Sequence, residues 1–152
     1  MSAFTTAGST IKVSAATPAT FNGAGYAALA WTTIGEITDL GEFGRMYNVV
    51  KHNPIANRGT VKKKGSFDEG TLTLQHAFDT HDAGQIILTA AVTSDNDYSF
   101  QITLQNGDKF YFQAQVTSSK PNPGGVDSIT AATTVLEITT NAAGVGIVPV
   151  LT

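Results

Sequence analysis

The chain has 152 residues, of which 41% are hydrophobic and 14% are charged, with a formal net charge of −3 and no cysteine. This length and hydrophobic content predict a single domain over residues 1–152 with a proper core, and they exclude a mainly disordered chain. The lack of cysteine excludes disulfides, cysteine-ligated zinc and thiol catalysis. The charged fraction is below the roughly 25% usual for soluble domains, which favours a subunit that buries much of its surface against copies of itself.

The first half of the chain contains one clear strand and two segments that resist a strand interpretation. Residues 1–9 show no basic-then-apolar signal pattern and are expected to form an N-terminal arm, and no stretch is apolar and long enough to cross a membrane. "TIKV" alternates and places Ile11 and Val13 on one side of a strand. Residues 15–28 are rich in Ala, Gly and Thr and predict a loop or arm. Residues 41–64 contain Gly, Pro and Asn and predict a long loop, of the kind that is functional or fixed by a partner.

The second half of the chain predicts a sheet with one helix beside it. Apolar residues recur every second position in four runs: Leu72, Leu74, His76 and Phe78; Phe100, Ile102 and Leu104; Phe110, Phe112, Ala114 and Val116; Leu136 and Ile138. Asn106-Gly107 between the second and third runs predicts a type I′ hairpin. From about 82 to 93 the period changes, and a helix is predicted whose buried face is Ala83, Ile86, Ile87, Ala90 and Ala91.

Both ends of this helix, and the end of the chain, carry further signals. Asp82 and Gln85 are spaced as an N-cap and its capping-box partner, and "SDND" at 94–97 is expected to end the helix. The tail from about 140 to 152 is apolar and has no evident place in the sheet. It is expected to be either disordered or docked on a neighbour.

The charges are unevenly distributed along the chain. Six of the nine Lys and Arg residues lie between residues 45 and 64, where there is no acid. Complementary patches on one molecule suit head-to-tail association, although a simply solvated loop is the plainer alternative. The candidate contact residues of this loop are Arg45, Lys51, Asn53, Arg58, Lys62, Lys63 and Lys64, and the candidate acidic counter-surface is Asp79, Asp82, Asp95 and Asp97.

The predicted outward positions of the strands are polar and uncharged. They are Thr71, Thr73, Gln75, Gln101, Thr103, Gln105, Gln113 and Gln115. Exposed sheet faces usually carry Lys and Glu. An uncharged face could form a subunit interface or line a channel for a charged polymer, or it could be an ordinary Thr-rich sheet.

Catalytic, metal and cofactor signals are weak, and we expect no enzyme. His52, His76 and His81 form no metal-ligand pair, and His76 lies on an apolar strand face, which indicates a structural role. "DND" at 95–97 lacks the glycine of a calcium loop, because Phe100 occupies its sixth position. No phosphate-binding or nucleophile-elbow motif is present. The lysine run lacks an accompanying aromatic platform or recognition helix, so nucleic-acid binding is not expected to be the main role.

One sequence order resembles a known family. It consists of "WTTIGEI" at Trp31–Ile37, "LGEFG" at 40–44, a basic loop, "KGSFDEGTLTL" at 64–74, "DAGQ" at 82–85 and two closing strands. This order is similar to the tail tube (major tail) proteins of long, non-contractile-tailed bacteriophages. The similarity covers about residues 10–145 and rests on overall pattern rather than on an invariant motif.

The resemblance implies a structural role in a virion tail. It implies a β-sandwich or barrel-like subunit with one flanking helix, six of which form a ring, with rings stacked into a hollow tube that conducts DNA without specific binding. The basic loop would then contact the next ring. Tape-measure and tail terminator or tip proteins would be partners, and assembly would take place in the host cytoplasm without a membrane.

Two other functions compete with this one. Tube proteins of contractile tails and of type VI secretion-like systems share the fold that the resemblance implies. A monomeric β-sandwich that binds carbohydrate or acts as an adhesive virion module would need an exposed aromatic platform, which only Tyr26, Trp31, Tyr47, Tyr98 and Tyr111 could supply.

Overall fold

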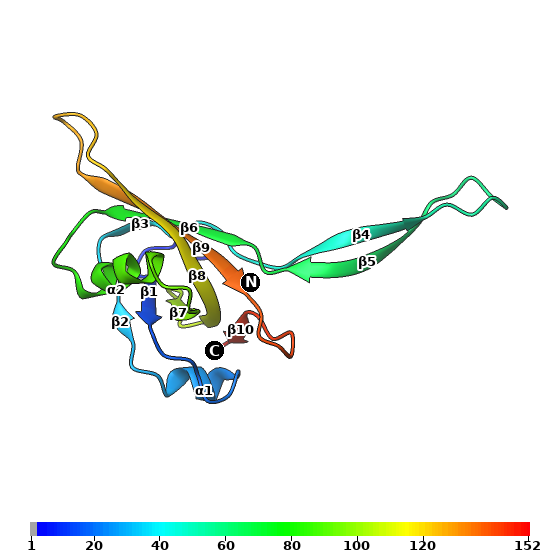
Figure 1. Ribbon diagram of the computed structural model, residues 1–152, viewed down its shortest axis with the longest axis horizontal. Helices are drawn as coiled ribbons and strands as arrows, with labels where there is room; N and C mark the ends of the chain where they lie inside the picture. Colours follow the sequence, from blue (N-terminus) through cyan, green and yellow to red (C-terminus); the bar gives the residue numbers. More distant parts are fainter. Residues whose placement is uncertain (1–2) are drawn as a thin grey trace.

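The computed structural model describes residues 3–152; Met1 and Ser2, within the predicted N-terminal arm, lie outside the described residues. A curled antiparallel sheet forms the body (Figure 1). Its strand order is β2-β1-β7-β8-β9-β6-β3, and β10 pairs with the start of β8. The strands are β1 (Thr10–Ser14), β2 (Thr32–Thr33), β3 (Ile37–Asp39), β6 (Thr71–Ala77), β7 (Tyr98–Thr103), β8 (Lys109–Asn122), β9 (Ala131–Thr139) and β10 (Val148–Val150). The predicted mainly β fold with a flanking helix is confirmed.

One face of this sheet, the core face, carries the alternating apolar side chains. Leu72 and Leu74 of β6, Phe100 of β7 and Leu136 of β9 are fully buried, as the period of two predicts. His76 is also buried on this face, where its Nε2 lies 3.0 Å from the Thr134 hydroxyl oxygen, so it has the structural role expected of it. Phe78 is an exception at 40% exposure, because β6 ends at Ala77.

Helix α2 (Ala83–Val92) covers the core face, and its bounds agree with the predicted helix. The Asp82 side chain caps it by accepting a hydrogen bond from the Gln85 amide at 3.0 Å. The predicted buried face is partly wrong, because Gly84 and Leu88 point inward while Ile86 is 53% exposed. Gly84 lies against β2, where a Cβ atom would come within 2.5 Å of the Thr33 carbonyl oxygen. The helix is therefore rotated so that its smallest residue meets the sheet.

The opposite face of β7 and β8 is covered by residues 15–31, which include a short second helix, α1 (Gly23–Ala27). Tyr26 is 1% exposed and stacks on Tyr111 of β8, with ring centroids 5.3 Å apart. Trp31 packs on the same tyrosine and donates its indole N–H to the Tyr26 carbonyl oxygen at 3.0 Å. The segment predicted as a loop or arm is thus a second packed layer on part of the sheet.

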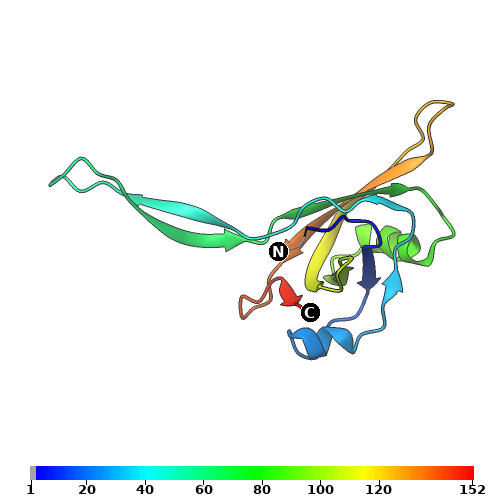
Figure 2. The same cartoon turned by 180° about the vertical axis from the view of Figure 1, so that it is seen from behind.

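The long loop predicted at residues 41–64 is wrong, because most of this segment forms a β-hairpin. Strand β4 (Met46–His52) pairs antiparallel with β5 (Val61–Asp68) as a separate two-stranded sheet. We call residues 46–68 the basic hairpin. It extends away from the body along the longest axis of the molecule, and the β8–β9 hairpin projects from the other end (Figures 1 and 2).

The turn after β7 and the C-terminal tail also differ from prediction. A hairpin does form at Asn106-Gly107, but Gly107 alone has positive φ there (+95°), which fits a type I turn followed by a left-handed glycine rather than type I′. The tail adds β10 to the main sheet, and the Thr152 amide donates to the Asp108 carboxylate at 2.9 Å. This hydrogen bond, with one from Asn106, lowers the pKa of Asp108. The tail therefore docks on its own chain.

Candidate assembly interface

The basic hairpin is a projection with almost no support from the body. Its two strands pair with each other, and neither has more than marginal contact with any other described element. Strand β4 has seven residues, which at about 3.3 Å per residue span about 23 Å. An isolated two-stranded hairpin is marginally stable in water. A projection of this length is therefore typical of an element that a partner covers.

Strand alternation gives the basic hairpin two different faces. Residues opposite each other in the register share a face, so Lys51 and Lys62 lie together, as do Val50 and Lys63. A β-bulge between Tyr47 and Val49 keeps Tyr47 on the side of Lys64, whose ammonium lies 5.0 Å from the tyrosine ring centroid. The cationic face consists of Tyr47, Val49, Lys51, Lys62, Lys64 and Phe67, and the mixed face consists of Met46, Asn48, Val50, His52, Val61, Lys63, Ser66 and the one acid of the hairpin, Asp68.

Apolar side chains are exposed on both faces and at the tip. Met46 is 71% exposed, Val49 is 59% exposed and Val50 is 56% exposed. At the tip (residues 53–60) Ile55 is completely exposed, while the Thr60 hydroxyl donates to the Asn53 side-chain oxygen at 2.7 Å and closes the turn. Exposed β-branched and thioether side chains beside lysines suit a contact surface that is both apolar and charged.

Arg45, at the base of the basic hairpin, binds within its own chain instead of pointing to a neighbour. Its Nε donates to the Glu69 carboxylate at 2.6 Å, and its guanidinium lies 3.8 Å from the centre of the Phe67 ring. The hydrogen bond to the Tyr47 hydroxyl and the contact with Glu69 raise the pKa of Arg45. Glu69 is 2% exposed and also accepts a hydrogen bond from the Ile147 amide at 3.2 Å. Arg45 and Glu69 therefore fix the root of the hairpin to the C-terminal tail.

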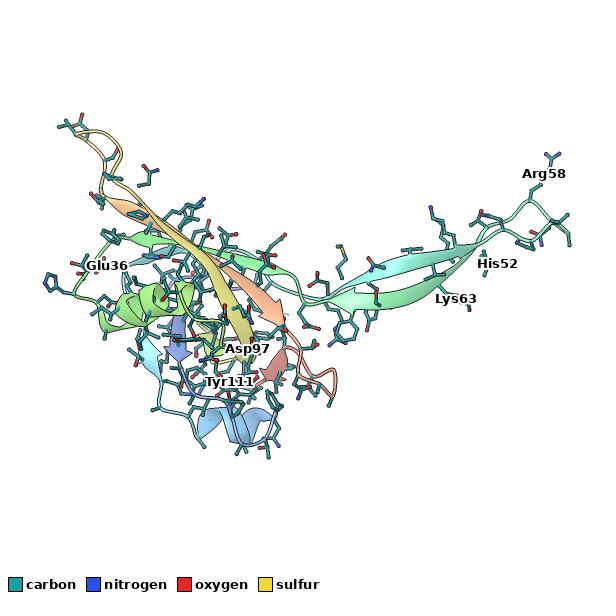
Figure 3. The ribbon with its side chains drawn as sticks, in the orientation of Figure 1. Glu36, His52, Arg58, Lys63, Asp97 and Tyr111 are labelled. Atoms are coloured by element: carbon teal, nitrogen blue, oxygen red, sulfur yellow. The ribbon has the colours of Figure 1, made fainter. Side chains whose placement is uncertain are left out.

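The remaining predicted cations lie along the basic hairpin, and the predicted acids lie elsewhere. Figure 3 places His52, Arg58 and Lys63 on the projection and Asp97 in the body. Within one chain the two groups do not meet. Any pairing between them requires a second copy.

The four predicted acids sit at the two ends of α2 and differ in availability. Asp82 is the helix cap and also accepts the Gly35 amide at 3.1 Å, so it has an internal role. Asp97 accepts from the Gln115 side chain at 3.0 Å, and Asp95 also lies beyond the C-terminal end of the helix. Asp79 precedes the helix, and one of its oxygens accepts the His81 amide at 2.9 Å.

The predicted uncharged strand face is divided in two. Thr71, Thr73, Gln75 and Gln115 are exposed, whereas Gln101 and Gln113 are 4% and 6% exposed beneath residues 15–31. Thr103 is half-buried and Gln105 lies exposed in the turn. The exposed part is not free of charge, because Glu137 lies between Thr71 and Gln115 in the register and Lys120 lies near Gln75. Asp39 of β3 lies opposite Gln75, so this face carries two acids and one base, which is a small excess of negative charge.

The side chains give little support to glycan binding or metal binding. Of the five aromatic residues that a glycan platform would need, only Tyr47 is exposed, while Tyr26, Tyr98 and Tyr111 are buried and Trp31 is half-buried. Among residues 3–152 no three metal-ligating side chains cluster. No helix within that range has the length and hydropathy needed to cross a membrane.

The chain shares its fold with chains of tail-like injection particles. No protein-family model and no curated protein matches the sequence. A chain in the sheath/tube terminator of an extracellular contractile injection system (PVC, extended state) matches with a TM-score of 0.69 and 9% identity, over 99% of both chains. A chain in the six-fold symmetrised baseplate of the anti-feeding prophage (AFP) matches with a TM-score of 0.67 and 9% identity, over 99% of this chain and 97% of the other. At these identities the similarity establishes the fold.

Proposed function

We propose that this chain is a structural subunit of a tail-like tube, and that it assembles with copies of itself head to tail. The observation that carries the proposal is the basic hairpin: a cationic and apolar projection without support from its own body. The low charge content of the chain is a second support, because a subunit covered by its neighbours needs few surface charges.

A contractile particle fits better than the non-contractile tail that the sequence order resembles. The two solved structures described above come from a contractile injection system and from a prophage baseplate, and both similarities span nearly the whole of each chain. The proposal therefore follows the contractile alternative, with the chain in or next to the tube. These two structures are a sheath/tube terminator and a baseplate, which supports a place at an end of the tube as well as in its shaft.

In the proposed assembly six subunits form a ring, by analogy with the six-fold AFP baseplate. The basic hairpin of each subunit contacts the next copy or the next ring. The exposed face around Thr71, Thr73 and Gln75, which is mostly uncharged with a slight acidic excess, lines the lumen or a subunit contact. A ring of six would carry six times −3, or −18. If the cargo is DNA, it would pass such a lumen without the strong, salt-dependent binding that basic walls produce.

The test is assembly of the purified protein, with two charge-reversal variants of equal net charge. Lys62 and Lys64 are changed to Glu in one, and Lys12 and Lys109 of the body in the other; each pair of changes takes the net charge from −3 to −7. We expect rings or tubes of uniform diameter in negative-stain images of the native protein and of the body variant, but not of the hairpin variant. A native protein that stays monomeric at high concentration would contradict the proposal.

A further inference from the structure

A cavity lies beside α2, between the helix, the segment that precedes it and the far half of β8. It has a volume of about 650 Å³ and is lined by Phe78, Asp79, Ile86, Ala90 and Pro121, among others. Specific ligand pockets span about 300–1,000 Å³. Ile86 is 53% exposed and Phe78 is 40% exposed. The strand pattern placed Phe78 in the core and the helix pattern placed Ile86 there, and the structure leaves both facing this cavity instead.

One edge of the cavity is acidic. Asp79 lines it, and its backbone N–H donates to the Gln85 side-chain oxygen at 3.0 Å, which holds this residue in place. One carboxylate oxygen accepts the His81 amide, and among the described residues the other has no hydrogen-bond partner. A ligand that fits this cavity therefore has an apolar part for Phe78 and Ile86 and a cation for Asp79.

The tip of the basic hairpin has this composition. Ile55 is completely exposed and lies between Pro54 and Ala56, and Arg58 follows three residues later. The hydrogen bonds from Thr60 to Asn53 and from the Gly59 amide to Asn57 fix the shape of the turn. A preformed apolar tip with an adjacent cation binds at a smaller entropic cost than a flexible loop.

The tip and the cavity lie at opposite ends of one molecule. Figure 1 shows the basic hairpin extending from one end of the sheet, while α2 and the β8–β9 hairpin lie at the other. A chain therefore cannot place its own tip in its own cavity. Two complementary surfaces at opposite ends of one chain generate rings or open filaments, because each added copy presents a new free surface.

We infer that the cavity beside α2 receives the hairpin tip of a second copy of this chain, with Ile55 against Phe78 and Ile86 and Arg58 beside Asp79. This inference rests on the proposed self-assembly and names its docking site. The proposed contact differs from one made only by the lysines. The apolar tip contributes burial of apolar surface, and the lysines contribute long-range attraction.

Disulfide cross-linking tests the contact directly, because the chain has no cysteine of its own. The double variant Ile55→Cys and Ile86→Cys is assembled and then oxidised. We expect a ladder of covalently linked subunits on a non-reducing gel, since a disulfide requires Cβ atoms about 3.5–4.5 Å apart. Two control pairs combine Ile55→Cys with Leu151→Cys or with Val126→Cys, both at exposed positions remote from Ile86 in sequence. Assembled protein without a ladder, or an equal ladder from either control pair, would overturn the docking site.

Single substitutions separate this inference from the proposed function. Ile86→Asp is compared with Val92→Asp, which alters another exposed residue of α2 outside the cavity lining. We expect Ile86→Asp to raise the concentration for half-maximal assembly at least about tenfold and Val92→Asp to leave it within about twofold. Arg58→Asp and Asp79→Arg should each weaken assembly, and together should restore it in part. If the reversal of Lys62 and Lys64 abolishes assembly while Ile86→Asp does not, the docking site is wrong and the proposed function stands; if the native protein does not assemble, both are wrong.

Discussion

The sheet body and the basic hairpin are built on opposite principles. The body buries its apolar side chains between a sheet and α2, and places a second layer, residues 15–31, over part of the other face. The basic hairpin has one β-ladder, no core, and exposed valines beside lysines. The body therefore has what it needs for stability within one chain, whereas the hairpin has no such packing within its own chain, and a partner supplies it only in the proposed assembly.

The largest expected effect comes from removing the basic hairpin. A variant in which residues 48–66 are replaced by Asn-Gly keeps the pair of Tyr47 and Phe67 at the root. We expect it to lose all self-assembly, because the contact element is gone, and to unfold at nearly the temperature of the native monomer. Electron microscopy measures the first outcome and circular dichroism the second. A truncated chain that still forms rings would place the contact elsewhere.

Truncation of a core side chain should instead lower the stability of the monomer. Leu74 is fully buried in the body, and Leu74→Ala should lower the free energy of unfolding by about 2–5 kcal/mol. Val50 is 56% exposed on the basic hairpin, and Val50→Ala should change the stability of the monomer by less than about 0.5 kcal/mol. Urea unfolding of the two variants measures both values. Similar losses in the two would mean that the hairpin packs on the body in the monomer.

High pH tests the layer formed by residues 15–31. Burial raises the pKa of Tyr26 to about 12, whereas an unfolded tyrosine ionises near 10. As the pH rises above about 10 the unfolded chain loses this proton first. The stability linked to Tyr26 is therefore fully present below about pH 10 and is lost as the pH rises to about 12. Two pKa units correspond to about 2.7 kcal/mol.

The measurement is the unfolding free energy between pH 9 and 12, compared between the native chain and Tyr26→Phe. Burial also raises the pKa of Tyr111, so some pH dependence should persist in the variant. The native chain should show the steeper decline. Identical curves would mean that Tyr26 is solvated and that the layer does not pack as described.

The smallest of these effects concerns the cap of α2. Asp82→Ala removes the acceptor for the Gln85 and Gly35 amides, and loss of a helix cap costs about 1 kcal/mol. Asp95→Ala, beyond the other end of the helix, is the matched control and should cost less. Thermal unfolding of the two variants distinguishes them. An equal loss would show that the cap contributes nothing specific.

The sequence predicts the body better than the hairpin, for a physical reason. Alternation locates Leu72, Leu74 and Phe100 because one face of their strands meets a core. Neither face of the basic hairpin is buried, so Val49, Val50 and Val61 show no alternation, and Pro54 and Gly59 suggest a loop. The signal that could have predicted the hairpin is a pair of short runs, Val-Val-Lys-His at 49–52 and Val-Lys-Lys-Lys at 61–64, on either side of a turn that contains Pro and Asn.

Two features of the site depend on contacts between distant segments. Gln101 and Gln113 occupy outward strand positions, yet they are buried beside Tyr111 and Ser99, the residues of this face that residues 15–31 contact. Ile86 has the spacing of a core residue, but the close approach of Gly84 to Thr33 turns the helix and exposes it. The period of apolar residues in the sequence predicts which residues share a face of a strand or helix, but it does not predict which segment covers that face.

Hydrogen exchange measured residue by residue tests the central claim most directly. The amides of β4 and β5 are compared in dilute monomer and in concentrated, assembled protein, with the amides of β6 and β9 as the internal reference. We predict that the hairpin amides exchange rapidly in the monomer and become protected on assembly, while those of β6 and β9 are slow in both. Hairpin amides that exchange at the same rate in monomer and assembly would contradict the account.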